Sequence, residues 1–140
     1  QKIDMNKWTT KFINLNDARK LSKMFCEYFN LPYCDVYLID EIKDAYGIYC
    51  WLDPYHVLIE QTCSNPIGIL VHELTHHLEF VHYAENNWFV MKQEPAHGYL
   101  YQLAKKRVIT WARRNISKNA NWNLPLRCKQ FQKDMKQFRL

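Results

Sequence analysis

The chain has 140 residues, which suits a single domain, and its 48% hydrophobic and 15% aromatic content is ample for a buried core. No apolar run approaches the length of a membrane span and no secretory signal peptide is recognisable, so we expect neither a membrane protein nor a secreted one. The five cysteines are odd in number and lack metal-type pairing, which favours free thiols and a reducing, cytoplasmic setting. Cys26, Cys34 and Cys50 lie among apolar neighbours and are expected to be buried.

The N-terminal half predicts a helix followed by a small sheet. Helical periodicity covers residues 16–30, and strand-like runs follow at residues 35–39, 47–51 and 57–61. We therefore expect an α+β fold, in which this helix and a sheet of about three strands pack on the helix that comes next.

The next helix is well specified. Ser64 and Asn65 are residue types that cap helix N-termini, and Pro66 suits the first helical position because no backbone N–H is needed there. Apolar residues then recur at three- and four-residue steps and form a stripe that faces the core, namely Ile67, Leu70, Val71, Leu74, Leu78 and Val81.

This helix carries the sequence His72-Glu73-Leu74-Thr75-His76, an H-E-x-x-H motif. Residues four apart lie on the same face of a helix, so His72 and His76 can hold one Zn²⁺. Glu73 then lies beside the open position of the metal, where a carboxylate can act as a general base on water. The motif predicts two metal ligands and a catalytic base.

A catalytic zinc site needs a third protein ligand, and His97 is the strongest candidate. Pro95 resembles the first residue of another helix, which places His97 in its first turn. Apolar residues at helical spacing continue to Trp111, so this helix can pack on the motif helix and present His97 to it. Glu94 is a rival third ligand.

His82 is the remaining alternative, because it occupies the third-ligand place of the longer motif H-E-x-x-H-x-x-G-x-x-H. That motif has Gly where this chain has Glu79, and in a continuous helix His82 lies about 9 Å along the axis from His76, too far to share a metal. Glu79 is expected about one turn beyond His76, where it either accepts a hydrogen bond from a ligand imidazole or is solvated. His77 points about 100° away from His76 and is not expected to be a ligand.

The order of these elements resembles the SprT/Spartan-like zinc metalloproteases, including their small phage-encoded relatives. The resemblance covers about residues 15–112: His72, Glu73 and His76 match the family motif, His97-Gly98 matches its third-ligand position, and Ala45-Tyr46-Gly47 matches its short strand. It implies a zincin-like metallopeptidase domain in which a zinc-activated water attacks a peptide carbonyl and Glu73 handles the proton.

The resemblance also implies where a substrate lies. In zincins the peptide adds as a strand to an edge of the sheet, and we expect that edge to be residues 57–61. A second group must stabilise the tetrahedral oxyanion, for which Tyr46, Tyr83 and Tyr99 are candidates.

The basic residues concentrate at the C-terminal end. Residues 101–140 hold eleven Lys and Arg and one Asp, a net charge of +10, whereas residues 1–100 hold eight basic and thirteen acidic residues, a net charge of −5. Trp111, Trp122, Phe131 and Phe138 are interleaved with the basic residues, a pattern that can bind phosphates and stack on unpaired bases. Solvated helix ends, with the aromatics in the core, or an acidic protein partner explain the same pattern.

We therefore expect one domain over residues 1–140, with a core at about 15–112 and a basic segment at 113–140. The expected activity is zinc-dependent peptide hydrolysis, with nucleic-acid-associated proteins as one class of substrate. The alternative is a nucleic-acid- or protein-binding module, such as a phage virion or assembly component, whose zinc site is structural or residual.

Overall fold

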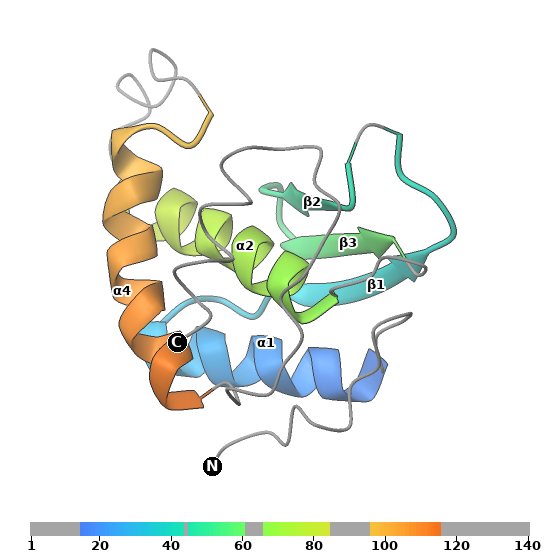
Figure 1. Cartoon of the computed structure of the whole chain (residues 1–140), viewed down its shortest axis with the longest axis horizontal. Coiled ribbons are helices and arrows are strands. Elements are labelled where there is room, and N and C mark those ends of the chain that lie inside the picture. The colour runs from blue at the N-terminus through green and yellow to red at the C-terminus, as the bar shows by residue number, and fades with distance from the viewer. Residues whose placement is uncertain (1–14, 44, 61–65, 85–95, 116–140) are drawn as a thin grey trace.

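The computed structural model describes residues 15–43, 45–60, 66–84 and 96–115, and in these ranges it is an α+β fold of three helices and a three-stranded sheet (Figure 1). The elements are helix α1 (Leu15–Phe29), strands β1 (Asp35–Ile39), β2 (Gly47–Cys50) and β3 (His56–Glu60), helix α2 (Pro66–Glu79), a π-helical turn (Phe80–Ala84) and helix α4 (Tyr99–Asn115). The predicted α+β class, with its small sheet of three strands, is thereby confirmed. None of the described helices is long and apolar enough to cross a membrane.

The sheet is mixed, with the strand order β1-β3-β2. Strands β2 and β3 form an antiparallel hairpin, and β1 pairs with β3 in parallel on its other side. The expectation that residues 57–61 form the edge of the sheet is therefore wrong. Strand β3 is central because both neighbours pair with it, and β2 is the edge strand that lies nearest the motif helix (Figure 1).

Helix α2 is the centre of the molecule. It lies between the sheet and α4, with α1 along one side (Figure 1), and 12 of its 14 residues are buried. Val36, Val57 and Ile59 are fully buried on the face of the sheet turned toward the helices. On the other side, Trp111 of α4 meets Phe25 of α1 edge-on, with 5.1 Å between ring centroids. Burial of this apolar surface is the main force that fixes α2 in place.

Two of the three cysteines expected in the core are there. Cys26 and Cys34 are buried, and this burial raises the pKa of both thiols, so they stay protonated and unreactive near neutral pH. Cys50 is only half-buried, contrary to expectation, because it ends the edge strand and pairs with His56 on the face turned away from the helices. Cys63 and Cys128 lie outside the described residues.

A buried histidine links α2 to the sheet and to the loop after α1. His77 Nε2 lies 2.8 Å from the carbonyl oxygen of Pro32 and donates to it, and the hydroxyl of Tyr49 lies 2.6 Å from His77 Nδ1. Burial lowers the pKa of His77 and so favours the neutral ring, in which Nδ1 is an acceptor because Nε2 carries the proton. Tyr49 therefore donates to Nδ1, and the edge strand β2 is fastened to α2 by a polar contact as well as by packing.

Removing the Tyr49 hydroxyl tests this link. Tyr49→Phe leaves His77 Nδ1 buried without its donor, so the free energy of unfolding in urea should fall by about 1–3 kcal/mol. Tyr28→Phe is the matched control, because Tyr28 is 57% exposed and its loss of a hydroxyl should change stability by less than about 0.5 kcal/mol. Equal effects of the two substitutions would contradict the link.

Candidate metal centre

The two histidines of the motif lie on α2 one turn apart. Their ring centroids are 5.1 Å apart, as the four-residue spacing predicts. His72 is buried and His76 is half-buried, because α2 is covered on nearly all sides by the sheet and the other helices. The predicted start of this helix at Pro66 is confirmed, whereas Ser64 and Asn65, its expected caps, lie outside the described residues.

His97 comes from a turn that precedes α4. It was expected in the first turn of a helix that starts at Pro95, but the structure begins α4 at Tyr99 and gives His97 a φ of 63°. This left-handed conformation costs a residue with a Cβ about 1 kcal/mol or more, and histidine tolerates it better than most residues. The Gln102 side chain stabilises the turn, because its Nε2 donates to the carbonyl oxygen of His97 at 3.1 Å.

The three imidazoles converge through their Nε2 atoms. His97 Nε2 lies 3.2 Å from His76 Nε2 and 3.2 Å from His72 Nε2, and all three ligating atoms lie within 4.8 Å of one another. Nitrogens bound to one zinc at about 2.0–2.1 Å in tetrahedral geometry are separated by about 3.3 Å. The cluster of His72, His76 and His97 can therefore hold a metal ion.

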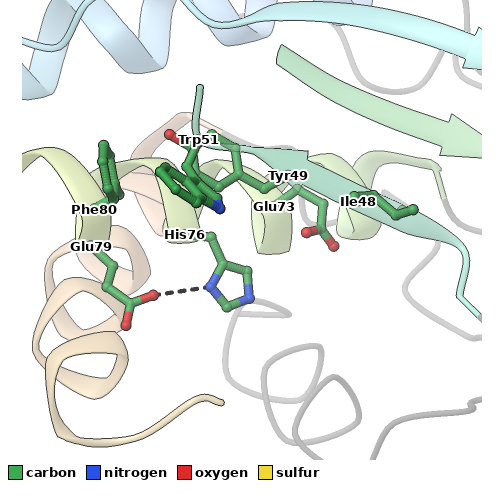
Figure 2. A pocket seen from close by; sticks show the side chains of 8 residues that line it. Ile48, Tyr49, Trp51, Glu73, His76, Glu79 and Phe80 are labelled. Carbon is green, nitrogen blue, oxygen red and sulfur yellow. Dashed lines mark hydrogen bonds and ion pairs between the residues drawn. The ribbon is translucent and has the colours of Figure 1, made fainter. Parts of the chain in front are cut away.

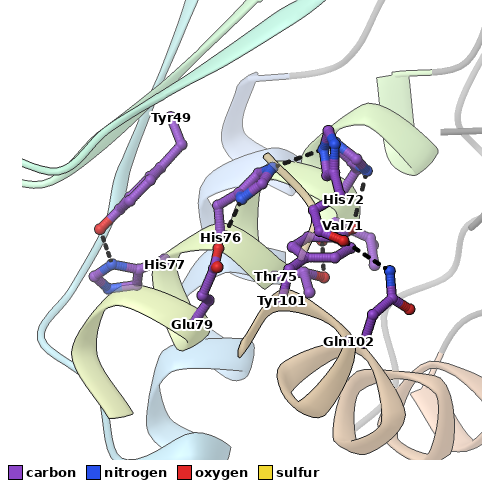
Figure 3. A network of polar contacts seen from close by, with 10 residues as sticks. Tyr49, Val71, His72, Thr75, His76, His77, Glu79, Tyr101 and Gln102 are labelled. Carbon is purple, nitrogen blue, oxygen red and sulfur yellow. Dashed lines mark hydrogen bonds and ion pairs between the residues drawn. The ribbon is translucent and has the colours of Figure 1, made fainter. Parts of the chain in front are cut away.

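Hydrogen bonds behind the cluster orient the rings (Figure 3). His76 Nδ1 lies 3.0 Å from the carboxylate of Glu79, and a carboxylate only accepts, so Nδ1 carries the proton and Nε2 keeps its lone pair. The hydroxyl of Tyr101 lies 3.1 Å from His72 Nδ1. A hydrogen bond from Nδ1 to this hydroxyl oxygen leaves the lone pair of His72 on Nε2, as in His76. Of the two alternatives expected for Glu79, the structure shows the acceptor for the His76 imidazole.

Tyr101 is a residue that sequence reasoning missed. It is fully buried, and its ring lies against all three histidines, with centroids 5.6 Å from His72, 4.6 Å from His76 and 4.8 Å from His97. Its ring thus forms an aromatic wall beside the cluster. The only available signal was its place four residues after His97, inside an apolar helical pattern that a tyrosine does not interrupt.

The other predicted ligands take other roles or are not described. His82 lies on the π-helical turn, where its Nδ1 receives a hydrogen bond from Arg107 at 2.9 Å, away from the cluster. His77 faces Pro32 and Tyr49, away from the three-histidine cluster. Glu94 lies outside the described residues.

Glu73 lies beside the cluster in a groove of about 360 Å³. The groove is bounded by α2 and the edge strand and is lined by Gly47, Ile48, Tyr49, Trp51, Glu73, His76, Glu79 and Phe80. The side chains of Glu73 and His76 point into it from the same face of α2 (Figure 2). The motif therefore brings one imidazole of the cluster and one carboxylate to a single accessible space.

Gly47 lets the edge strand approach this carboxylate. A Cβ at this position would lie 2.5 Å from Ile69 Cγ2 and 3.3 Å from Glu73 Oε2. The first distance is shorter than van der Waals contact allows, so any larger residue would push β2 away from α2. The short strand therefore needs glycine here for packing.

None of the three tyrosines expected to stabilise an oxyanion lines the groove. The Tyr83 hydroxyl accepts from Arg107 at 3.2 Å on the π-helical turn, and the side chain of Tyr99 is 65% exposed. Tyr46 packs against the hydrophobic core.

The backbone of β2 offers hydrogen-bonding groups along its outer edge. Glu60 N donates to Tyr46 O at 2.9 Å, so Tyr46 and Glu60 are a hydrogen-bonded pair of the antiparallel ladder. Hydrogen-bonded and non-hydrogen-bonded pairs alternate along such a ladder, which makes Gly47–Ile59 and Tyr49–Val57 non-hydrogen-bonded pairs. The N–H and C=O groups of Gly47 and Tyr49 therefore point away from β3. Within the described ranges no other strand pairs with this edge.

Part of the basic C-terminal region is described, on α4. Lys105 is buried, whereas Lys106, Arg113 and Arg114 are exposed at the surface. Arg107 lies 5.3 Å from the ring centroid of Phe29 and donates to His82. Trp111 is a core residue. Trp122, Phe131 and Phe138 lie outside the described residues, so the predicted polyanion-binding surface stays a prediction.

Comparisons with protein-family models, with curated proteins and with solved structures give no match to this chain. Its function is therefore inferred from the geometry of the metal centre and from the motif that supplies the ligands.

We predict one bound metal ion per chain, because three imidazoles converge on one point. Elemental analysis of protein purified without added metal measures the stoichiometry, which should fall from about one to near zero in His97→Ala. His82→Ala is the matched control and should keep its metal, since His82 faces Arg107. Full metal content in His97→Ala together with loss in Glu94→Ala would assign the third position to Glu94 instead.

We also predict that Tyr101→Phe weakens metal binding while the chain stays folded. The substitution removes the hydroxyl that contacts His72 Nδ1 and keeps the ring, and loss of such a partner costs about 10- to 100-fold in metal affinity. Competition with a chromophoric chelator measures the dissociation constant. Tyr99→Phe, on an exposed neighbour, should leave the constant unchanged; a similar loss in both variants would contradict a specific role for Tyr101.

Proposed function

We propose that this protein is a zinc-dependent metallopeptidase. The observation that carries the proposal is the convergence of three imidazole nitrogens within 4.8 Å of one another, beside a groove that also contains the carboxylate of Glu73. Three histidines and a nearby carboxylate are the ligand set and the base that hydrolytic zinc sites use. The resemblance of the motif and of the element order to SprT/Spartan-like proteases supports the same activity.

The donor set supports zinc over hard cations. Mg²⁺ and Ca²⁺ prefer oxygen ligands, whereas imidazole suits zinc and other transition metals. Three neutral imidazoles also leave a tetrahedral ion one position for a substrate or a water. When bound, zinc supplies a Lewis acid that polarises a carbonyl group and lowers the pKa of water.

Glu73 is the proposed general base. Its carboxylate accepts a proton from the water that attacks the peptide carbonyl carbon, and it then gives that proton to the amine that leaves as the C–N bond breaks. Glu73 is only 8% exposed, so the surrounding side chains hold it in one place beside the groove. The neighbouring Gly47 keeps the edge strand within contact of this side chain.

The substrate is proposed to lie along β2 as an added strand. The outward N–H and C=O groups of Gly47 and Tyr49 can pair with an extended peptide, and Gly47 contacts Glu73. This places the backbone of a bound peptide beside the proposed base. The proposed edge is β2 and not residues 57–61, because β3 is paired on both sides.

Glu73→Gln is the decisive substitution. It keeps the size of the side chain but removes the base, so hydrolysis of an unfolded protein such as reduced casein should fall at least about 100-fold while metal content stays the same. Glu27→Gln, on the exposed face of α1, is the matched control and should keep full activity and full metal content.

The same experiment separates the peptidase from a binding module with a structural metal. A structural site predicts no hydrolysis by the parent protein and no effect of Glu73→Gln. Hydrolysis at the parental rate by a metal-loaded Glu73→Gln protein would sink the proposed mechanism.

A further inference from the structure

The groove has an aromatic end that the proposed chemistry does not use. Trp51 follows β2 and Phe80 follows α2, and their ring centroids lie 5.7 Å apart. Trp51 is 45% exposed, and Phe80 is half-buried and also packs against Tyr55, with centroids 6.2 Å apart. Figure 2 shows Trp51 and Phe80 at one end of the pocket, with Ile48 toward the other end.

The charges in the groove favour an apolar occupant at this end. Besides His76, no described residue that lines the groove is basic. The acidic lining residue nearest in sequence to Phe80 is Glu79, whose carboxylate is engaged with His76 Nδ1. An acidic side chain would therefore have no cation to pair with here. A large apolar side chain would instead pack on the two rings and be removed from contact with water.

The aromatic end lies in register with the edge of the sheet. Trp51 is four residues beyond Gly47, which corresponds to about 13 Å along an extended chain. Gly47 lies beside Glu73, since a Cβ added to it would come within 3.1 Å of Glu73 Cγ, so a strand added to β2 reaches Trp51 about three to four residues from the point where it passes the base. Alternate side chains of such a strand face the same way, so one of them is directed at the aromatic rings.

We infer that Trp51 and Phe80 form a specificity site for a large apolar side chain of an extended peptide, about three to four residues from the scissile bond. The inference rests on the proposed peptidase function and adds its substrate class: unfolded segments that carry Phe, Leu or Trp at one fixed distance from the cleaved bond. Trp51 and Phe80 contact the substrate and not the reacting atoms, so they are specificity-determining residues.

The test uses zinc-loaded Glu73→Gln protein, which binds peptides without cleaving them. In a series of fluorescein-labelled ten-residue peptides, a single Phe is moved through an otherwise Ala/Ser sequence, and binding is measured by fluorescence anisotropy. One position should bind at least about tenfold more tightly than the peptide without Phe, because burial of one large apolar side chain supports an effect of this size.

Substitutions then assign the preference. In the Glu73→Gln background, Trp51→Ala and Phe80→Ala should reduce the preference for the peptide with Phe at that position to less than about twofold. Trp51→Phe should keep part of the preference. Leu52→Ala is the matched control, because Leu52 is 66% exposed beside Trp51 but does not line the groove.

The failures of the two proposals are distinguishable. Hydrolysis by the parent protein with no preferred Phe position overturns the specificity site and keeps the peptidase. A Phe preference that depends on Trp51, in a protein that hydrolyses nothing, keeps the site and removes the peptidase. Absence of any peptide binding, or self-association in sedimentation that disappears in Trp51→Ala without a Phe preference, overturns the specificity site.

Discussion

The burial of α2 is the constraint on which the rest of the structure depends. A helix that is covered on nearly every side has few positions where a polar group can meet water, so each polar side chain on it needs a partner within the protein. Thr75 donates to the carbonyl oxygen of Val71 at 2.7 Å, and His77 bridges Pro32 and Tyr49. His72 contacts Tyr101. The hydrogen bonds behind the histidine cluster thus also satisfy polar groups of the buried central helix.

Burial also explains why the third histidine can come from a separate segment. Helix α4 packs on α2 through apolar residues such as Ala104 and Val108, which are fully buried. This packing sets the position of the turn that precedes α4. That turn holds His97 in a left-handed conformation. A residue in a costly conformation persists only where its surroundings determine it. Here the surroundings are the side chain of Gln102 and the helix that comes after the turn.

The features that repeat locally could be predicted from the sequence. Helical periodicity and Pro66 placed α2 correctly, and the strand-like runs at 35–39, 47–51 and 57–61 differ from β1, β2 and β3 by at most one residue at either end. The pairing of His72 with His76 and the acceptor role of Glu79 follow from helix geometry alone.

The features that depend on distant contacts could not be predicted in the same way. Strand order is set by which strands pair in three dimensions, and nothing local in residues 57–61 marks them as central. The positive φ in this turn falls on His97 and not on the glycine that follows it, so the sequence gives no local sign of it, and Pro95 predicts an earlier helix start. The position of Tyr101 in the sequence does not indicate its role, because its hydroxyl meets His72 only after α2 and α4 have packed.

The shortness of β2 limits what its edge can recognise. Only Gly47 and Tyr49 direct backbone groups outward, which gives at most four hydrogen bonds, and each contributes a net of about 0.5–1.5 kcal/mol. That sum, about 2–6 kcal/mol, is comparable to the cost of immobilising a free peptide, which is about 4 kcal/mol or more. A chain already paired within its own sheet or helix has no backbone groups to offer. This edge therefore distinguishes partners by their folding state before it distinguishes them by sequence, and anything it holds by backbone contacts alone will be released quickly.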